Sequence, residues 1–278
     1  MAMAGAVLAP AGCAWLGISS ADPESVASTG VPSSDQVQVQ DRRLDLATGP
    51  WLDYRTYKPV AAQPEHGAHR PWVVLAHGFL RDQRRMRGLA MALAEAGFPV
   101  ATLNGRQDSL LSGGHVAHSR DMVKLARALD AERVIYAGFS AGGLAALLAA
   151  RQDHKAEGVL TLDLVDSQGL GRRAANGLGA PLLALVGAPS NCNADNNAAP
   201  IYEIAPLARV TPIPQASHCD FESPSDWLCR LVCEQSPDST RNRTLRQPRG
   251  HGETSPVQRQ IIQAAVTGIR QLADSRSR

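Results

Sequence analysis

The stretch Val134-Ile135-Tyr136-Ala137-Gly138-Phe139-Ser140-Ala141-Gly142-Gly143 gives the clearest indication of how this chain folds. An apolar, β-branched run leads into a Gly-x-Ser-x-Gly pattern and then into the Ala- and Leu-rich segment 144–150, which predicts a strand, a tight turn and a helix. In such a turn the backbone at Ser140 is strained, and a Cβ at Gly138 or Gly142 would collide with the neighbouring strand or helix. The N–H groups at the start of the helix favour negative charge beside the serine. The pattern predicts a nucleophilic serine, and a merely glycine-rich strand–helix turn is the alternative.

Composition restricts the classes of function. The 278 residues suffice for one sizeable hydrophobic core, and 28 Lys and Arg against 26 Asp and Glu leave a formal charge of +2. This balance creates no field that would favour nucleic acid, and aromatic residues at 4% make a stacking platform for bases or sugars unexpected. Because the sequence has no apolar run of about 20 residues, we expect no membrane-spanning helix.

Residues 1–36 are expected to be an export signal and a linker. Ala2–Ala14 is small and apolar, and Ala11-Gly12-Cys13 has the ending of a bacterial lipoprotein cleavage site, which would make Cys13 a lipid anchor. The run lacks a preceding Lys or Arg, and Pro10 stands where such sites usually carry Leu. Ile18–Gln36 is rich in Ser, Asp, Pro and Gly, which is typical of a tether. We expect an exported protein, periplasmic, extracellular or lipid-anchored, and a cytoplasmic protein with a disordered N-terminus is the alternative.

The remaining four cysteines fit an oxidising compartment. Cys192, Cys219, Cys229 and Cys233 all lie in the last third of the chain, around loops expected to carry an acid and a histidine. Two disulfides would hold these loops, with three pairings possible. A zinc site is the competitor, but histidines at a matching spacing are missing, and free thiols are the remaining alternative.

Residues 37–278 are expected to form one domain of the α/β class. Strands are predicted at 38–46, 52–57, 72–76, 98–103, in the apolar run before Gly138, and at 158–165, 181–186 and 210–214. Helices are predicted at 86–96, 121–129, 144–150 and 258–272. Strands that alternate with helices at this spacing indicate a mostly parallel sheet covered on both faces, the architecture of the α/β-hydrolase fold.

A candidate oxyanion hole follows the strand at 72–76. The turn His77-Gly78-Phe79 lies at the carboxyl end of that strand, where sites of such sheets are found. We expect the backbone N–H groups of Phe79 and Ala141 to converge on the oxygen that becomes negative during acyl transfer. His77 itself is expected to be a structural histidine that packs the turn.

The candidate general base is His218. Three histidines follow Ser140, and His218 comes directly after the last predicted strand, where the fold requires the base. His154 lies in a charged stretch after the serine's helix, and His251 lies in the polar segment 236–255. An exposed loop histidine is the alternative role for His218.

The candidate acid is harder to choose. The usual strand, 181–186, is followed by a loop in which Asp195 comes late. One strand earlier, Asp163 and Asp166 lie near a strand end, and an acid there can still orient the imidazole. We expect Asp163 first, then Asp166, then Asp195.

Four segments together resemble the chlorophyllase-like α/β hydrolases, with cutinase-type polyester hydrolases as more distant relatives. These segments are His77-Gly78-Phe79, Gly138–Gly143, Leu162-Asp163-Leu164-Val165-Asp166 and the loop of His218 with its later cysteines. Chlorophyllases carry Asp-Pro-Val-Asp after the strand that follows the serine's helix, and the first aspartate, taken as their triad acid, matches Asp163. This chain has Leu164 for the proline, Ala141 for an arginine and a shorter histidine loop, so the resemblance implies the fold and triad but not the chlorophyll substrate.

The combined expectation is a serine hydrolase that cleaves carboxylic esters through an acyl-enzyme, with Ser140, Asp163 and His218 as its triad. We expect no metal and no organic cofactor, a small-molecule or lipid-like ester as substrate, no nucleic-acid partner and a monomer. An acyltransferase or amidase of the same fold, and an inactive binding protein, are the alternatives. The loops 104–118 and 191–199 are expected to shape the pocket. Four arginines, 81, 84, 85 and 87, are expected to be a solvated helix start rather than a site for an anionic substrate.

Overall fold

The computed structural model describes residues 35–46, 51–60, 70–105, 114–233 and 254–275, all within the unit Ser33–Arg278. The expected export signal with Cys13 and the candidate His251 lie outside the described residues. No helix among the described residues is both long and apolar enough to cross a membrane.

The described residues form an eight-stranded sheet with the order β1-β2-β4-β3-β5-β6-β7-β8. The strands are β1 Val37–Leu44, β2 Leu52–Pro59, β3 Trp72–Ala76, β4 Val100–Leu103, β5 Val134–Phe139, β6 Ala156–Leu162, β7 Leu182–Val186 and β8 Ala208–Pro212. β1 and β2 pair antiparallel, β2 pairs antiparallel with β4, and the other pairs are parallel. The expected mostly parallel sheet is confirmed, with an antiparallel hairpin at one edge.

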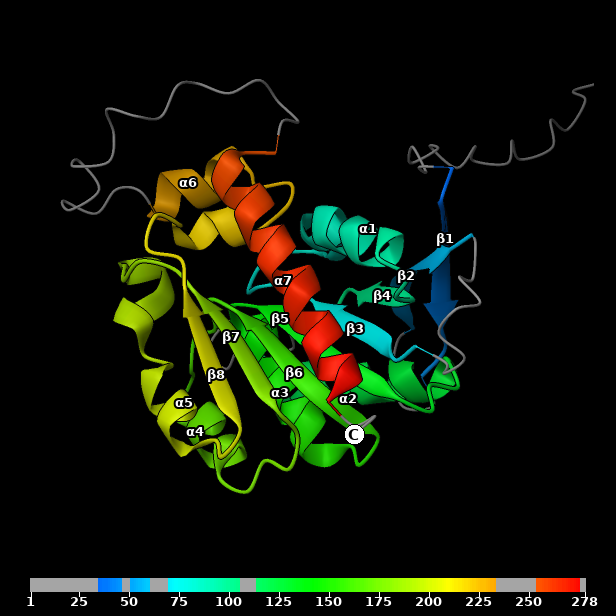
Figure 1. Cartoon of the computed structure of the whole chain (residues 1–278), viewed down its shortest axis with the longest axis horizontal. Coiled ribbons are helices and arrows are strands. Elements are labelled where there is room, and N and C mark those ends of the chain that lie inside the picture. The colour runs from blue at the N-terminus through cyan, green and yellow to red at the C-terminus, as the bar shows by residue number, and fades with distance from the viewer. Residues whose placement is uncertain (1–34, 47–50, 61–69, 106–113, 234–253, 276–278) are drawn as a thin grey trace, which may run out of the picture. The chain divides into compact units, whose positions relative to one another are not determined.

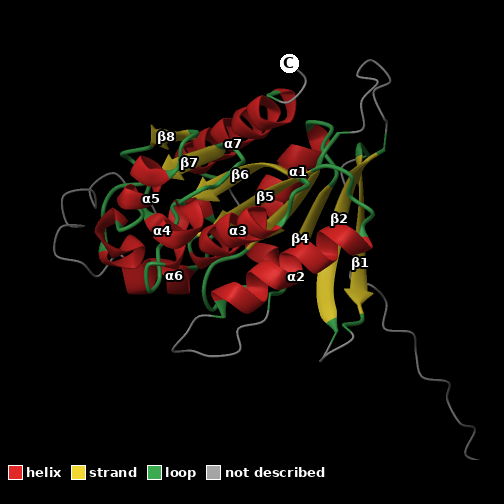
Figure 2. Ribbon diagram, turned by 90° about the horizontal axis from the view of Figure 1, so that it is seen from below, coloured by secondary structure: helices red, strands yellow, loops and turns green. Residues whose placement is uncertain are grey.

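Helices cover both faces of this sheet (Figure 1, Figure 2). They are α1 Arg87–Glu95, α2 His115–Ala128, α3 Ala141–Gln152, α4 Leu170–Ala175, α5 Ala199–Ile204, α6 Trp227–Cys233 and α7 Pro256–Asp274. One hydrophobic core joins the sheet to α2, α3, α4 and α5, and a second joins its other face to α1 and α7. Because both faces are covered, every residue of β5 is buried, as its continuous apolar run predicts.

The C-terminal helix α7 shows how local sequence sets an element. Ser255 caps it: the Ser255 hydroxyl accepts a hydrogen bond from the Gln258 N–H at 3.0 Å, and the Gln258 side chain accepts one from the Ser255 N–H at 2.9 Å. Pro256 occupies the first turn, where its missing N–H costs nothing. Residues 261, 265, 269 and 272 then recur at helical spacing and are buried against the sheet. The helix predicted at 258–272 is confirmed.

The helix predicted at 121–129 begins earlier than expected. α2 begins at His115, so that His115 and His118 are helical and buried rather than part of a loop that reaches residue 118, and Ser119 is helical and buried as well. These side chains are three and four residues apart, so they lie on the same buried face of the helix as Met122. The prediction was wrong because polar residue types were taken as a loop signal, although here they form the buried face of a helix.

Short elements after β6 were also missed. α4, α5, α6 and the 3-10 turns at Asn191–Asn196 and His218–Phe221 lie in segments for which no element was predicted. None exceeds seven residues, so hydrophobic periodicity has too few positions to reveal it. The two 3-10 turns follow the carboxyl ends of β7 and β8.

Candidate functional site

The turn between β5 and α3 has the geometry expected of a nucleophile elbow. Ser140 has φ 53° and ψ −120°, in the left-handed half of backbone space, and it is 8% exposed. A Cβ at Gly138 would lie 2.2 Å from the carbonyl oxygen of Gly142, and a Cβ at Gly142 would lie 2.3 Å from that of His77. Glycine is therefore needed at both positions for β3, β5 and α3 to approach this closely.

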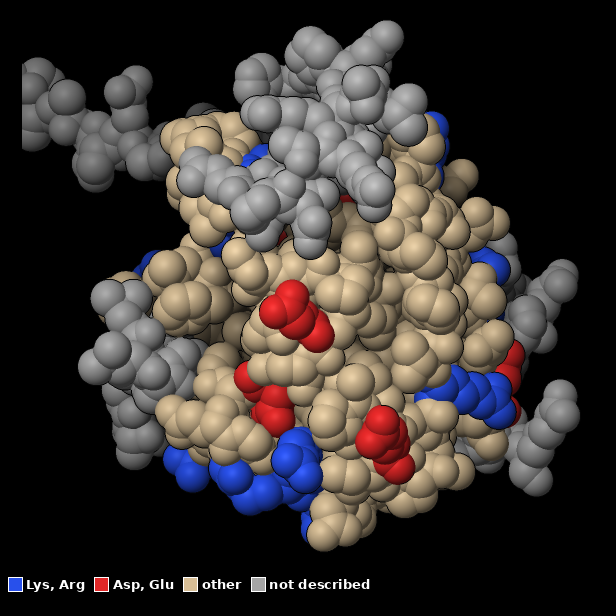
Figure 3. Space-filling model, turned by 90° about the vertical axis from the view of Figure 1, so that its left-hand side faces the viewer, with Lys and Arg blue, Asp and Glu red and all other residues tan. Residues whose placement is uncertain are grey.

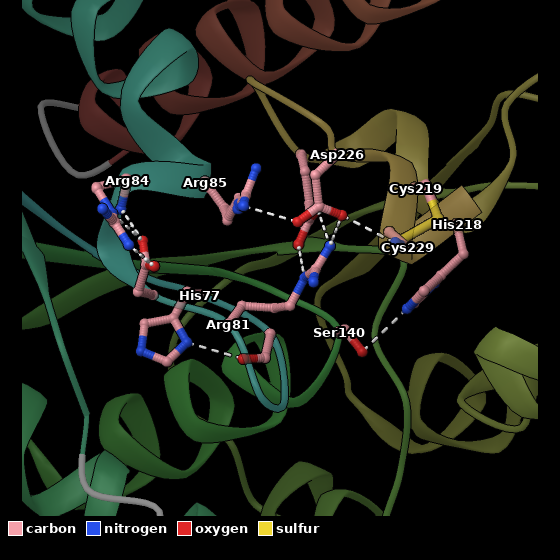
Figure 4. Close-up of polar contacts among 12 residues, drawn as sticks. His77, Arg81, Arg84, Arg85, Ser140, His218, Cys219, Asp226 and Cys229 are labelled. Atoms are coloured by element: carbon pink, nitrogen blue, oxygen red, sulfur yellow. Dashed lines mark hydrogen bonds and ion pairs between the residues drawn. A yellow bond between two sulfur atoms is a disulfide. The ribbon is translucent and has the colours of Figure 1, made fainter. Parts of the chain in front are cut away.

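His218 faces the serine from the loop after β8. Its Nε2 lies 3.1 Å from the Ser140 Oγ, and Figure 4 shows the ring pointing at the hydroxyl. The ring packs on Phe139, with centroids 4.7 Å apart. The 3-10 turn that carries it is capped: the Asp220 carboxylate accepts hydrogen bonds from the N–H and hydroxyl of Ser217, at 2.9 and 2.8 Å. The loop therefore holds His218 in one orientation toward the serine.

Of the three candidate acids, the structure brings Asp163 to His218. Asp163 follows β6 with φ 46°, is 1% exposed, and its Oδ2 lies 2.6 Å from the Nδ1 of His218. Its other oxygen accepts a hydrogen bond from the N–H of Gly187 at 2.9 Å. The Asp166 carboxylate instead accepts a bond from the Gly171 N–H at the start of α4, and Asp195 is exposed. Ser140, His218 and Asp163 therefore form a continuous hydrogen-bonded series. The alternatives Asp166 and Asp195 are not part of it.

The turn after β3 lies against the elbow. A Cβ on Gly78 would lie 2.9 Å from the Phe139 ring and 3.4 Å from the Ser140 Cβ, so the backbone of this turn is beside the serine. Phe79 follows it and is 37% exposed, and Ala141 is the first residue of α3. The expected donor residues Phe79 and Ala141 thus belong to two segments that meet at Ser140.

Three buried histidines come from the turn after β3 and from the first turn of α2. His77, His115 and His118 are 2%, 7% and 5% exposed, and the rings of His77 and His118 have centroids 5.3 Å apart. The Nδ1 of His77 lies 2.8 Å from the Gly78 carbonyl oxygen, which accepts its proton and fits the structural role expected of this residue. Burial lowers the pKa of each of the three, most strongly that of His118, so this cluster is neutral near pH 7.

An ion-pair network joins the turn after β3 to the histidine loop (Figure 4). The Arg81 guanidinium donates to both oxygens of buried Glu222, at 2.6 and 2.7 Å, and to Asp226 at 2.8 Å. Arg85 pairs with the same Asp226 at 2.6 Å. The hydrogen bonds that Arg81 donates to Glu222 outweigh burial and raise the pKa of Arg81. The expectation of a solvated arginine cluster was wrong for Arg81 and Arg85, because acidic partners about 140 residues away in the sequence hold them.

Both expected disulfides are present. Cys192 pairs with Cys233 and Cys219 with Cys229, which selects one of the three possible pairings. Both bonds end in α6 and connect it to the 3-10 turns at Asn191–Asn196 and His218–Phe221. Within the described residues, the one group with metal-ligand spacing is Cys219, Cys229 and Cys233, whose sulfurs are all in these disulfides. Two disulfides fit an oxidising compartment.

An open pocket of about 380 Å³ lies beside the acid. It is lined by Leu164, Val186, Asn196, Ala198, Ala199, Tyr202, Glu203 and Val210. Of these residues, Leu164 directly follows Asp163 in the chain. Val186 directly precedes Gly187, whose N–H donates to Asp163, so the pocket adjoins Asp163. Figure 3 shows acidic and basic side chains scattered among uncharged residues on this side of the molecule, and Trp227, Leu228, Leu231 and Val232 of α6 are exposed.

Comparison with known proteins identifies the fold. No protein-family model and no curated protein sequence matches the chain. A ferulic acid esterase from Streptomyces cinnamoneus superposes with a TM-score of 0.60 at 16% identity, over 89% of this chain and 93% of the other. A predicted CIB-like hydrolase from Thermoplasma acidophilum gives 0.54 at 15% identity, over 74% and 99%. The esterase domain of a Rhodothermus marinus protein gives 0.53 at 18%, over 65% and 89%. With the strand order above, these similarities show that the chain has the α/β-hydrolase fold.

Proposed function

We propose that this chain is a serine hydrolase that cleaves carboxylic esters through an acyl-enzyme. The observation that carries the proposal is the hydrogen-bonded series Asp163–His218–Ser140, with distances of 2.6 and 3.1 Å between its polar atoms. A nucleophile, a base within reach of its proton and an acid that orients the base are the groups that acyl transfer by serine requires. Their order in the chain, Ser, Asp, His, is that of the α/β-hydrolase fold.

In the first half-reaction, His218 takes the hydroxyl proton as the Ser140 Oγ attacks the ester carbonyl carbon. The carbonyl oxygen becomes negative and is stabilised by the N–H groups of Phe79 and Ala141. The tetrahedral species collapses when the C–O bond to the alcohol breaks, and His218 gives its proton to the departing oxygen. The products of this half are the free alcohol and an ester between the acyl group and Ser140.

In the second half-reaction, His218 takes a proton from water, which attacks the acyl-enzyme carbonyl. The proton then returns to the Ser140 Oγ as the carboxylic acid leaves. Asp163 keeps the proton of the imidazole on Nδ1, so that Nε2 can accept, and its charge stabilises the imidazolium formed in each half. The two half-reactions require no metal and no organic cofactor.

The substrate and setting are part of the proposal. The exposed apolar side chains of α6 favour a small-molecule or lipid-like ester, and the disulfides favour an exported protein, with Cys13 as its lipid acceptor. Asp163 directly after β6 supports placement in the chlorophyllase-like branch of the fold. We further propose one catalytic domain over residues 37–278, acting as a monomer without nucleic acid.

A fluorophosphonate probe and a p-nitrophenyl ester panel test the proposal. We expect the wild type to be labelled and to hydrolyse short p-nitrophenyl esters, and Ser140→Ala to lose both, with turnover reduced about 10⁶-fold. Ser275→Ala, which changes a serine at the end of α7, serves as the matched control and should keep both activities. Labelling of folded Ser140→Ala equal to wild type would contradict the assignment. Transfer to an added alcohol in preference to water would indicate an acyltransferase, faster cleavage of the matching anilide an amidase, and an unlabelled wild type a binding protein.

A further inference from the structure

Asn193 occupies an unusual place beside the candidate acid. It lies in the 3-10 turn between β7 and α5, and it is completely buried although its side chain is polar. Its Nδ2 lies 3.1 Å from the Asp163 Oδ2, the same oxygen that faces the Nδ1 of His218. A buried amide in this position is a direct contact of the group that orients the base.

The hydrogen bonds of Asn193 determine the orientation of its amide. Nδ2 donates to the carbonyl oxygen of Ala188 at 2.8 Å and to Asp163. Oδ1 accepts from the backbone N–H groups of Ser190 at 2.8 Å and Asn196 at 3.3 Å. A flipped amide would place NH₂ against two N–H groups and an oxygen against a carboxylate and a carbonyl, so only one orientation is compatible with these partners. The amide is therefore fixed as a donor to Asp163.

The backbone around Asn193 is strained. Ala194, Asp195 and Asn196 have φ of 49°, 53° and 58°, in the left-handed region that residues with a side chain enter at a cost. The Asn193 side chain holds this segment at both ends, through Ser190 and Asn196, and the Cys192–Cys233 disulfide anchors the residue before it. Strain of this kind persists where the surroundings impose it and is concentrated at functional sites.

The charge of Asp163 explains why such a donor is needed. Asp163 is 1% exposed, so water cannot solvate its carboxylate. While His218 is neutral, the carboxylate is stabilised by neutral donors: the N–H of Gly187 on Oδ1, and Asn193 together with the imidazole N–H on Oδ2. With Gly187 and Asn193 in place, rotation of the carboxylate about its last bond would break two hydrogen bonds. Without Asn193, the imidazole N–H of His218 would be the one donor left from the described contacts of this oxygen.

We propose that Asn193 is a positioning residue for the proposed reaction: it fixes the Asp163 carboxylate so that Oδ2 stays aimed at His218. The inference rests on the proposed function, since it assigns a role within the same series of residues. Asn193 does not touch the ester, and it acts through Asp163 and His218. When a neutral donor to a buried charge is removed, the lost hydrogen bond corresponds to a factor of about 10–100, and here we expect this factor in kcat.

The test uses two variants of Asn193 and one matched control. Asn193→Ala removes the donor and the acceptor, whereas Asn193→Asp keeps an oxygen for the N–H groups of Ser190 and Asn196 but replaces the donor by a second carboxylate. The control is Asn197→Ala, because Asn197 lies in the same segment and bonds the backbone of Asp166 at 2.9 Å through both its amide atoms. The quantities measured are kcat, KM and the pH profile of kcat/KM with a p-nitrophenyl ester, each per folded molecule from circular dichroism.

We expect Asn193→Ala to lower kcat about 10–100-fold with KM nearly unchanged, and Asn197→Ala to remain near wild type. In Asn193→Asp the acidic limb of the kcat/KM profile should move to higher pH, because an added carboxylate near His218 stabilises the protonated imidazole. A residue that only supports the fold would lower the folded fraction and leave kcat per folded molecule unchanged. If Asn193→Ala does not fold, Asn193→Asp decides through kcat per folded molecule, which should fall because the donor to Asp163 is lost.

The outcomes separate the two levels of the argument. A wild type that neither labels nor hydrolyses would refute the proposed function, and the role of Asn193 with it. A wild type that is active, with kcat per folded molecule and the acidic limb unchanged in the folded Asn193 variants, would refute the positioning role alone.

Discussion

The two sides of the site are built in different ways. The serine side, β5–Ser140–α3, consists of two regular elements and a turn whose close approach depends on glycines. The acid and base side consists of loops after β6, β7 and β8, with short 3-10 turns, buried polar contacts and two disulfides. Backbone sterics set the position of Ser140, whereas side-chain bonds between distant segments set the positions of Asp163 and His218.

This difference has an energetic consequence. Backbone packing around Gly138 and Gly142 is part of the hydrophobic core, so the serine side loses its geometry only if the sheet itself is disturbed. The loops on the other side are held by polar bonds between separate segments and by two disulfides, and we expect such segments to open locally. We therefore expect perturbations of the two sides to separate chemistry, global stability and local stability.

After the loss of Ser140 itself, the largest effect is expected from the acid. Asp163→Asn keeps the size of the side chain but loses the charge that stabilises the imidazolium and selects its tautomer, and should lower kcat about 10⁴-fold. Asp166→Asn is the matched control and should stay near wild type, because that carboxylate bonds the N–H of Gly171 instead. Esterase kinetics on both folded variants measure this. A larger loss in Asp166→Asn than in Asp163→Asn would show that the order of candidates is wrong.

The next effect concerns global stability on the serine side. Gly142→Ala places a Cβ 2.3 Å from the His77 carbonyl oxygen and 2.7 Å from that of Ala76, both backbone atoms that cannot move alone. We expect a loss of about 3–5 kcal/mol in the free energy of unfolding, at the upper end of overpacking effects. Gly179→Ala is the control, since a Cβ there meets nothing within 4 Å. Equal urea midpoints for the two variants would contradict a close-packed elbow.

The same contrast explains what could be predicted from the sequence. The elbow is local: strand, turn and helix are contiguous, and the role of Gly138 and Gly142 follows from steric size alone. The sheet could be predicted because each buried strand carries a short apolar run, and α7 because its apolar residues repeat over five turns. His218 and Asp163 could be selected as candidates because the fold orders its sites along strand ends.

The contacts that hold these candidates could not be predicted in the same way. Asn193 has no distinguishing local pattern, and the disulfide at Cys192 is the one signal near it. Arg81 and Glu222 are 141 residues apart, so their pairing requires the three-dimensional arrangement of β3 and the histidine loop. The buried face of α2 begins with His115 and His118, residue types that a hydrophobicity pattern counts as polar.

A smaller effect is expected from the disulfides. Removal of Cys192–Cys233, which closes 41 residues, should lower stability by about 4 kcal/mol, and removal of Cys219–Cys229, which closes 10, by about 3 kcal/mol, as upper values from chain entropy. The test is urea unfolding of the two double Cys→Ser variants, in which circular dichroism and esterase activity are both recorded at each urea concentration. Activity should be lost at lower urea than helix content, because the loops open before the sheet. Coincident transitions would show that the loops and the sheet unfold together.

The smallest effect is expected from His118, a buried polar residue of α2. This helix packs against α3, so His118 tests whether a polar group next to the serine side also affects stability. Burial lowers the pKa of His118 well below its ordinary value of 6.5, so below pH 6.5 the unfolded chain binds a proton that the folded chain does not. The contribution of this residue to stability is therefore complete above about pH 6.5 and decreases as the pH falls below it. His118→Phe keeps a planar ring without a titrating group and should reduce the difference in melting temperature between pH 7.5 and pH 5. The exposed His154→Gln should leave that difference as in wild type. If His118→Phe retains the full acid sensitivity, the buried histidines are not its source, and the polar loops of the other side account for the loss.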